Sequence, residues 1–179
     1  MTRPFCFAVI ADSHFRVEGD DLQSSHPSDA GHNDRNRRAV QLLLAARPEH
    51  IVHLGDVPHP VPGLAAHQVA LAIALETYAP FGETRFTVVP GNHDTYDMIP
   101  RMGRRRRSEI KEEAYLAFAG RIGMGPNESG LYNKLLGDVA AVGINSCMMS
   151  RVPLSASGEV SGDQLSWIRE LGKDGAFRE

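Results

Sequence analysis

The segment that decides the fold is Phe-Cys-Phe-Ala-Val-Ile-Ala-Asp-Ser-His, residues 5–14. Its first seven residues are all apolar, and they run directly into the polar triplet that closes the segment. A short unbroken apolar run is typical of a strand buried on both faces of a sheet. Two more strand-like runs follow at residues 51–54 and 85–89. The sequence therefore predicts three buried strands, each ending in polar or glycine residues.

Helical spacing fills the segments between these strands. Apolar residues repeat at helical intervals from a cap at Asn33 or Asp34 to about residue 46, and again over residues 64–78. A proline just beyond each helix stops it. Strand, loop and helix thus alternate, which predicts an α/β fold with parallel strands. In such sheets ligands bind beyond the carboxyl ends of the strands.

The second half of the chain shows a different order of elements. Residues 95–107 are expected to form a loop, and residues 108–119 predict a helix that begins with a capping serine. The runs at 131–136 and 139–147 flank a Gly-Asp turn signal, which indicates a β-hairpin. Ser161 is the expected cap of a last helix.

The composition places the chain among globular proteins. The 179 residues are 42% hydrophobic and 23% charged, with a net charge of −3 at pH 7. Disorder needs low hydrophobicity with high net charge, and a generally basic nucleic-acid binder needs a positive balance, so both classes are excluded. The length indicates one domain over residues 1–179.

We expect neither a secretory signal nor a membrane segment. The apolar run near the N-terminus is too short for a signal and is not followed by a cleavage site. No stretch approaches the roughly 20 apolar residues of a membrane helix. A disulfide between Cys6 and Cys147 stays open, but two buried free thiols in a reducing compartment are the simpler interpretation. The expected localisation is therefore cytoplasmic, without a membrane partner.

Residues able to bind a metal ion follow all three predicted strands. Asp12, His14, Asp56 and Asn92 together offer two carboxylates, an imidazole and an amide oxygen. This mixed oxygen and nitrogen set suits Mn, Fe, Zn or Mg ions. Asp12 and His14 are two positions apart, so they leave a strand on the same side and can reach one ion. The sequence predicts a metal site at this edge of the sheet.

The three strand ends together resemble a known family. Asp12-x-His14, then Gly55-Asp56, then Gly91-Asn92-His93-Asp94 are similar, in order and spacing, to the first three motifs of the calcineurin-like metallophosphoesterases. The resemblance implies a metallophosphoesterase-type β-sandwich flanked by helices. It also implies hydrolysis of a phosphomonoester or phosphodiester substrate, with two divalent metal ions as cofactors.

The resemblance implies a role for each motif residue. Asp12 and His14 would hold the first metal ion, Asp56 would bridge both ions, and Asn92 would bind the second ion and a substrate phosphate oxygen. His93 would act beside the leaving group as general acid or electrostatic stabiliser, with Asp94 orienting its ring. Two ions roughly 3.5–4 Å apart would clamp the phosphate while a metal-bound hydroxide attacks the phosphorus atom.

The sequence departs from the family after His93. The family continues with a further histidine and a Gly-His-x-His motif, whereas all eight histidines here lie at or before position 93. We therefore expect a domain incomplete at its C-terminus, with one metal site of moderate affinity and a second that is weak. The missing strands should leave apolar surface exposed, which favours self-association.

Two other functions stay open beside the hydrolase. The chain could be a catalytically impaired or inactive binding module that lacks the C-terminal ligands. It could also bind nucleic acid through the arginine run of Arg101 and Arg104–Arg107, although no aromatic residues interleave with that run. The same run could instead be a solvated loop or could steer phosphate to the site.

The remaining histidines divide into three groups. His53 lies inside a predicted strand and is expected to be a core residue. His59 follows Asp56 by three residues and is either a substitute ligand or a surface residue. The others are expected at the surface: His26, His32, His50 and His67.

Overall fold

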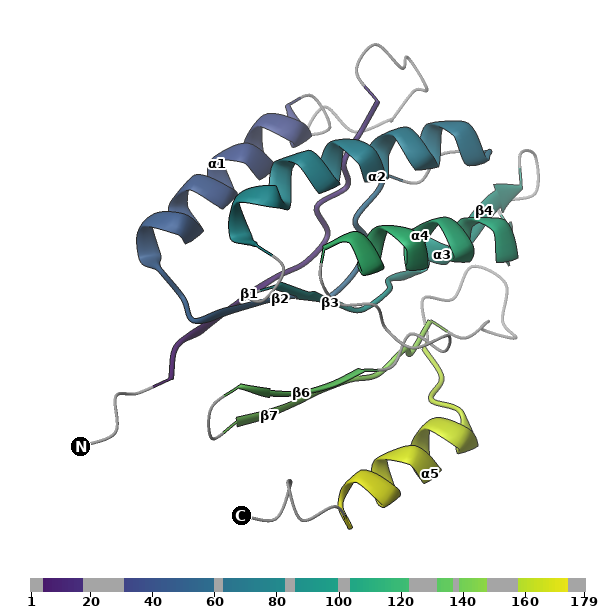
Figure 1. Cartoon of the computed structure of the whole chain (residues 1–179). Helices are drawn as coiled ribbons and strands as arrows, with labels where there is room; N and C mark the ends of the chain where they lie inside the picture. The colour runs from purple at the N-terminus through teal and green to yellow at the C-terminus, as the bar shows by residue number, and fades with distance from the viewer. Residues whose placement is uncertain are drawn as a thin grey trace.

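A three-stranded parallel sheet forms the centre of the molecule (Figure 1). Its strands lie in the order β1-β2-β3: β1 spans Phe7–Ile10, β2 spans His50–His53 and β3 spans Phe86–Val88. The parallel α/β arrangement predicted from the sequence is thereby confirmed. The computed structural model describes residues 5–17, 31–59, 63–82, 86–99, 104–122, 132–136, 139–147 and 158–173.

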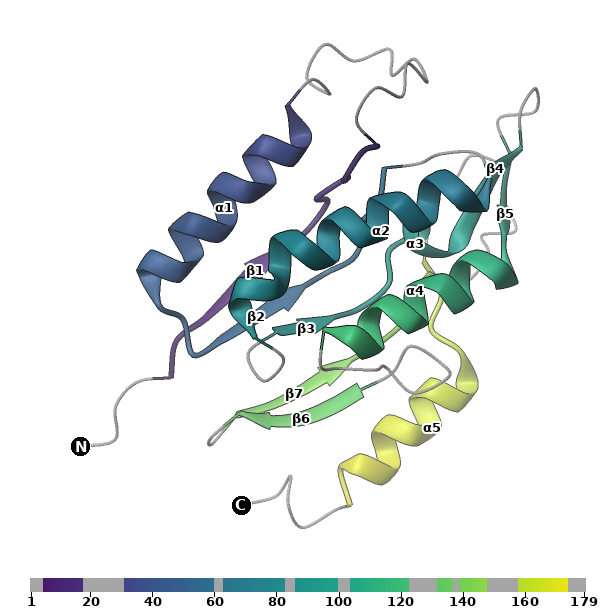
Figure 2. The same cartoon turned by 45° about the horizontal axis from the view of Figure 1, so that its top comes forward.

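Three helices cover one face of this sheet (Figures 1 and 2). They are α1 (His32–Ala46), α2 (Leu64–Tyr78), which continues into the short 3-10 helix η2 (Ala79–Phe81), and α4 (Glu109–Arg121). The helix predicted over 64–78 is confirmed at both ends. In the described part of the chain, no helix combines the length and the apolar character needed to cross a membrane.

The start of α1 differs from the prediction. Gly31 precedes the first helical residue and adopts a left-handed conformation with φ 85°. Asn33 therefore lies within the helix, not at its cap. Its side chain accepts a hydrogen bond from the Arg16 N–H at 3.0 Å and donates one to the Arg16 carbonyl at 2.8 Å. The amide that the sequence suggested as a cap thus ties the loop after β1 to α1.

The core lies between the sheet and these helices. Tyr78, at the end of α2, is central to it, because its ring centre lies 5.0 Å from that of Phe86 and 5.3 Å from that of Phe15. Phe81 stacks against both Tyr78 and Phe86. Val40, Leu71 and Phe118 add apolar side chains from the three helices. This packing fixes the Tyr78 ring, whose hydroxyl is hydrogen-bonded to Ser13 in the loop after β1.

The segment predicted as a loop at 95–107 contains a second, two-stranded sheet, so that prediction was wrong. After the single-turn helix α3 (Asn92–Thr95), strand β4 (Tyr96–Ile99) pairs antiparallel with β5 (Arg104–Arg107). Four successive arginines give no alternation between apolar and polar residues, so the sequence holds no strand signal there. Arg101 lies outside the described residues, as do the side chains of β5.

The hairpin predicted in the second half is confirmed. Strand β6 (Tyr132–Leu136) pairs antiparallel with β7 (Val139–Gly143). Figure 1 shows this hairpin on the sheet face opposite the three helices, with α5 (Gly162–Leu171) beyond it. Ser161 caps α5 by accepting a hydrogen bond from the Gln164 N–H, as predicted. The layers are therefore helices, parallel sheet, hairpin and helix.

An apolar groove of about 370 Å³ lies between the parallel sheet and the hairpin. Because the hairpin leaves part of this sheet face open, Phe7 is 53% exposed and Val9 is 52% exposed. The prediction that the first strand is buried on both faces was therefore wrong for this face. Residues from both sheets line the groove, among them Phe7, Val52, Leu54, Val89, Val139 and Val142.

Histidine burial agrees with the sequence in one case and corrects it in two. His53 is fully buried in β2, as predicted. His50 and His67 were expected at the surface but are buried. The His50 ring can lie inside the sheet because its Nε2 is hydrogen-bonded to Thr87 Oγ1 at 3.1 Å. His26 lies outside the described residues.

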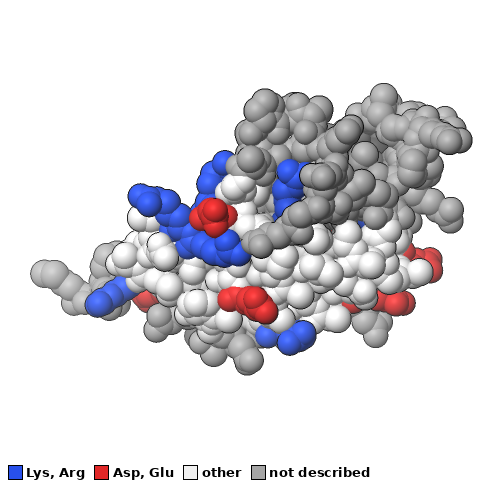
Figure 3. All heavy atoms as spheres, turned by 90° about the horizontal axis from the view of Figure 1, so that it is seen from above, with Lys and Arg blue, Asp and Glu red and all other residues white. Residues whose placement is uncertain are grey.

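The face viewed in Figure 3 carries charges of both signs. Basic groups gather on one side of it around an acidic group, and the rest of the described surface in this view is largely uncharged. On α1, Arg37 Nη1 lies 2.7 Å from Asp34 Oδ1. The described residues in this view therefore form no continuous basic band of the kind that tracks a nucleic-acid backbone.

Candidate functional site

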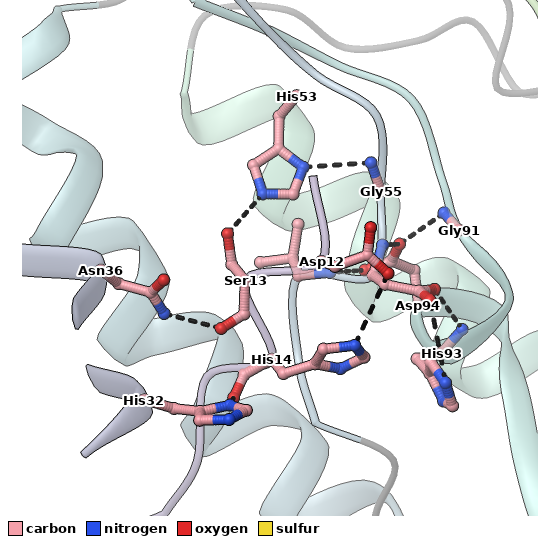
Figure 4. Close-up of polar contacts among 12 residues, drawn as sticks. Asp12, Ser13, His14, His32, Asn36, His53, Gly55, Gly91, His93 and Asp94 are labelled. Carbon is pink, nitrogen blue, oxygen red and sulfur yellow. Dashed lines mark hydrogen bonds and ion pairs between the residues drawn. The ribbon is translucent and has the colours of Figure 1, made fainter. Parts of the chain in front are cut away.

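The loops that follow β1 and β2 run side by side at the carboxyl edge of the parallel sheet (Figure 4). Their backbones continue the pairing of the two strands. The Asp12 N–H donates to the Gly55 carbonyl at 3.0 Å, and the His14 N–H donates to the Asp56 carbonyl at 3.1 Å. Asp12, His14 and Asp56 are thus neighbours because backbone hydrogen bonds hold their loops together.

Three of the residues in these loops have a left-handed backbone. The φ angles are 55° for Asp12, 45° for His14 and 56° for Asp56. A residue other than glycine held in this region costs about 1–3 kcal/mol, and such strain clusters at functional sites. The proximity of Asp12 and His14 therefore arises from a left-handed turn, not from the strand alternation that the sequence suggested. Nothing in the sequence marks these backbone angles.

Two glycines allow the loop after β3 to join the other two. A side chain at Gly55, whose φ is 96°, would overlap with the backbone of Pro90 and Gly91. A side chain at Gly91 would overlap with the backbone nitrogen and the carboxylate of Asp56. The loops after β2 and β3 therefore touch backbone to backbone, which only glycine permits at both positions.

The buried side chain of Asp94 links these two loops through hydrogen bonds. Its side chain is fully buried and accepts hydrogen bonds from the backbone N–H groups of Asp56, Val57 and Gly91. The pKa of Asp94 is raised to about 8, first by burial and then by the charge of Asp56, against the lowering effect of the three amide hydrogen bonds. The observed contacts make Asp94 an anchor for the loops. Its expected role of orienting the His93 ring stays a prediction.

Three side chains converge where the loops meet. His14, Asp56 and His93 each offer a ligand atom, and these atoms all lie within 4.8 Å of one another. His93 Nε2 lies 3.7 Å from Asp56 Oδ2, and the His93 N–H donates to Asp56 Oδ1 at 2.9 Å. All three residues are half-buried. Two imidazoles and a carboxylate form a donor set that suits a divalent transition metal.

One unpartnered atom supports a cation at this point. His14 Nδ1 is buried and has no hydrogen-bond partner. A buried imidazole nitrogen without a hydrogen-bond partner is costly, so such atoms in native structures call for an explanation, for example a bound ion. The donor set and this orphaned nitrogen together fit a divalent metal ion held by His14 and Asp56.

A family comparison agrees with this geometry. The family model described as calcineurin-like phosphoesterase matches residues 6–170, which is nearly the whole chain. The chain belongs to this family. No curated protein matched the sequence.

The other two predicted metal ligands, Asp12 and Asn92, belong to the same loops as this trio. Asp12 lies at the solvent edge of the site, with a side chain that is 69% exposed and an Oδ1 3.7 Å from His14 Nε2. Asn92 is the first residue of α3 and is half-buried next to His93. The structure thus gathers all the predicted site residues at one sheet edge, and it adds His93 to the set of converging donor atoms.

Two histidines that the motifs do not include also lie close to this candidate metal site. The His59 ring centre is 5.8 Å from that of His14, and the His32 ring centre is 6.2 Å from it. His32 Nδ1 lies 3.3 Å from the His14 carbonyl oxygen. The sequence suggested His59 through its distance from Asp56, whereas His32 was expected at the surface. Only the position of α1 beside the first loop brings His32 here.

Cys147, which follows β7 of the β6–β7 hairpin, contacts the loop after β3. Its thiol donates a hydrogen bond to the Pro90 carbonyl at 3.2 Å. Burial, followed by the charges of Asp94 and Asp56, raises the pKa of this thiol to about 12. The thiol therefore stays protonated at neutral pH and acts as a donor that supports the loop after β3. No feature of the sequence predicts this contact.

Proposed function

We propose that this chain is a metal-dependent phosphoesterase that hydrolyses a phosphomonoester or a phosphodiester at the site formed by His14, Asp56 and His93. The observation that carries the proposal is the convergence of these three side chains at the carboxyl edge of the sheet, with His14 Nδ1 buried and unpartnered. Membership of the calcineurin-like phosphoesterase family supports the same reaction class.

The chain's own residues would divide the work of holding the ions. His14 and Asp12 would hold one divalent ion, Asp56 would contact both ions, and Asn92 would contact the second ion together with a phosphate oxygen. A divalent ion bound there neutralises phosphate charge and lowers the pKa of a water molecule. Because fewer side chains surround the second position, we propose that it binds its ion more weakly. Mn, Fe, Zn and Mg all suit this donor set.

His93 would serve the leaving group. Its ring lies at the inner wall of the site, and its backbone N–H is fixed by Asp56 Oδ1. We propose that this imidazole donates a proton to a departing oxygen or stabilises its negative charge. Asp94 acts indirectly, because its three amide hydrogen bonds hold the loops that carry Asp56 and His93.

We also propose a cytoplasmic location and contacts between copies of the chain. Cys6 and Cys147 are both free, and Cys6 is exposed and not buried as expected from the sequence. Free thiols, one of them exposed, fit a reducing compartment. The exposed apolar face that includes Phe7 and Val9 favours self-association.

The test is hydrolysis of bis-p-nitrophenyl phosphate and of p-nitrophenyl phosphate in the presence of Mn²⁺, with Asp56→Asn as the variant. Asparagine tolerates the left-handed backbone and keeps an oxygen that can accept the His93 N–H, but it removes the charge. We expect turnover to be lost together with most of the Mn²⁺ affinity. Asp34→Asn, which removes an exposed carboxylate on α1, is the matched control and should leave turnover unchanged.

The outcomes separate the candidate functions. Turnover that survives in Asp56→Asn would reject the site assignment. Mn²⁺ and phosphate binding without turnover in the wild type would favour the second function, an inactive phosphoester-binding module. Relative rates on the two substrates distinguish a diesterase from a monoesterase. For His93→Gln, a fall in kcat with an unchanged Mn²⁺ affinity is expected if the ring serves the leaving group, whereas a loss of Mn²⁺ affinity would assign the ring to the metal ion instead.

A further inference from the structure

We propose that a buried chain of three hydrogen-bonded side chains, Ser13, His53 and Tyr78, holds the left-handed turn that presents Asp12 and His14. The three are then positioning residues, because none of them is expected to touch substrate or metal. The catalytic meaning of the inference rests on the proposed function, but the structural claim does not.

At His53, the donor and the acceptor of each hydrogen bond in this network are defined (Figure 4). The Gly55 N–H donates to His53 Nδ1 at 3.0 Å, so that nitrogen carries no proton. The proton of the neutral ring is then on Nε2, which lies 2.7 Å from Ser13 Oγ and donates to it. Ser13 Oγ is in turn hydrogen-bonded to the Tyr78 hydroxyl at 2.5 Å. The hydrogen bond from Gly55, in the loop after β2, thus selects the His53 tautomer that donates to Ser13, in the loop after β1.

Burial keeps the network of Ser13, His53 and Tyr78 in a single protonation state and geometry. His53 is fully buried, Ser13 is 8% exposed and Tyr78 is 3% exposed. Burial, followed by the charge of His14, lowers the pKa of His53 to about 3, so the ring is neutral at pH 7. The Tyr78 ring is packed against Phe15 and Phe86, which fixes the position of its hydroxyl. Each polar atom in the chain therefore has a defined partner and little freedom to move.

Ser13 is the residue between two strained neighbours. Asp12 and His14 both have positive φ angles, and such residues persist only when the surrounding structure over-determines them. The Ser13 side chain is held by His53 and Tyr78, and its carbonyl accepts a hydrogen bond from Asn36 Nδ2 at 2.7 Å. One residue is thus tied to β2, α2 and α1 at once. These ties are what keep the strained turn in place.

The test compares Ser13→Ala and Tyr78→Phe with Thr87→Val. The first two each remove one hydroxyl from the chain. The control removes a hydroxyl that is hydrogen-bonded to His50 and is likewise buried in the parallel sheet. The first readout, made without metal, is amide hydrogen exchange of Asp12 and His14, normalised to amides of α2. The second is the Mn²⁺ dissociation constant.

We expect the Asp12 and His14 amides to exchange faster in Ser13→Ala and Tyr78→Phe but not in Thr87→Val. Partners that orient metal ligands typically contribute about 10–100-fold to affinity, so the Mn²⁺ dissociation constant should rise about tenfold in the first two variants. In the double variant of Ser13→Ala and Tyr78→Phe, the Mn²⁺ dissociation constant should rise by less than the product of the two single effects, because both changes break one network. Tyr78→Phe preserves the ring and keeps the test informative if Ser13→Ala unfolds.

Two failures can be told apart. Unchanged exchange of the Asp12 and His14 amides in both variants overturns the positioning role, whatever the metal data show. If the wild type binds no Mn²⁺, the proposed function fails, while the exchange data still decide whether the network holds the turn. An equal loss of Mn²⁺ affinity in Thr87→Val also overturns the inference, because the effect would then be a general loss of stability.

Discussion

At the scale of single residues, the loops after β2 and β3 approach each other backbone to backbone. Gly91 lies against the backbone and the carboxylate of Asp56, and Gly55 lies against Gly91. A new side chain at Gly55 would meet only backbone atoms, and one at Gly91 would meet both the backbone nitrogen and the carboxylate of Asp56, so the loop or that carboxylate would have to move. The position of the Asp56 carboxylate thus depends on a residue that bears no side chain.

Replacing Gly91 by alanine should therefore damage both stability and metal binding. We expect a loss of about 1–3 kcal/mol in the free energy of unfolding, the usual cost of overpacking, and a weaker affinity for Mn²⁺. Urea denaturation and calorimetric titration measure the two effects. Gly120→Ala is the matched control, since Gly120 lies in α4 with open space around it and should gain about 0.5–1 kcal/mol. A Gly91→Ala variant as stable as the wild type would contradict this account.

The sequence was informative about the kinds of residue at the site but not about their backbone. Asp12, His14, Asp56 and Asn92 could be picked out because polar residues at the ends of parallel strands meet at one edge. The positive φ angles of three site residues could not, because Asp and His adopt a left-handed conformation at only a minority of positions and the residue type does not mark which ones. The approach of His32 depends likewise on how α1 packs.

At the scale of elements, α4 supports the short helix that carries His93. It packs against both α2 and α3. Ser108 caps its N-terminus, because the hydroxyl accepts the Lys111 N–H. The Lys111 side chain is buried, and its amine lies 3.5 Å from the Tyr96 carbonyl just after α3. The first turn of α4 thus contacts the backbone at Tyr96, the residue that follows α3.

Removing this cap should destabilise the fold without changing the metal ligands. For Ser108→Ala we expect a loss of about 0.5–2 kcal/mol in the free energy of unfolding, with little change in Mn²⁺ affinity. Ser108→Asp retains a capping oxygen and should restore most of the stability. Equal urea midpoints for the alanine variant and the wild type would show that the hydroxyl does not cap the helix.

Elements were predicted well where local chemistry marks their ends. The serine caps of α4 and α5 and the prolines beyond α1 and α2 act through the nearest turn, so they can be found in the sequence. The hairpin of β4 and β5 could not be found, because its pairing joins a mixed segment to a run of arginines. This hairpin depends on α3, which precedes β4, and on α4, which follows β5, because these helices hold its two ends.

At the scale of the whole molecule, the two sides of the parallel sheet differ in how well they are covered. Three helices bury one face, whereas the hairpin of β6 and β7 leaves a groove of about 370 Å³ on the other. Phe7 and Val9 are each more than half exposed there. The sequence predicted a strand buried on both faces, because an apolar run alone does not reveal how much another sheet covers it.

A charge at this face should reduce the self-association that we propose. For Phe7→Lys we expect the dimer dissociation constant to rise by roughly tenfold or more, as when an interface loses a central aromatic anchor. Sedimentation velocity over a range of protein concentrations measures it. Leu42→Lys places the same charge at an exposed position on α1 and should have little effect. A wild type that stays monomeric at high concentration would contradict the proposal.

The site is formed by loops that follow separate strands, and this affects the order in which the molecule folds. Strand β1 pairs Ile10 with His53, and β2 pairs His53 with Val88, so each partner lies more than thirty residues away along the chain. No short stretch of a nascent polypeptide contains the whole cation pocket. Non-local parallel pairing forms slowly compared with helices. Capture of an ion during refolding would therefore mark the completion of the sheet and not its nucleation.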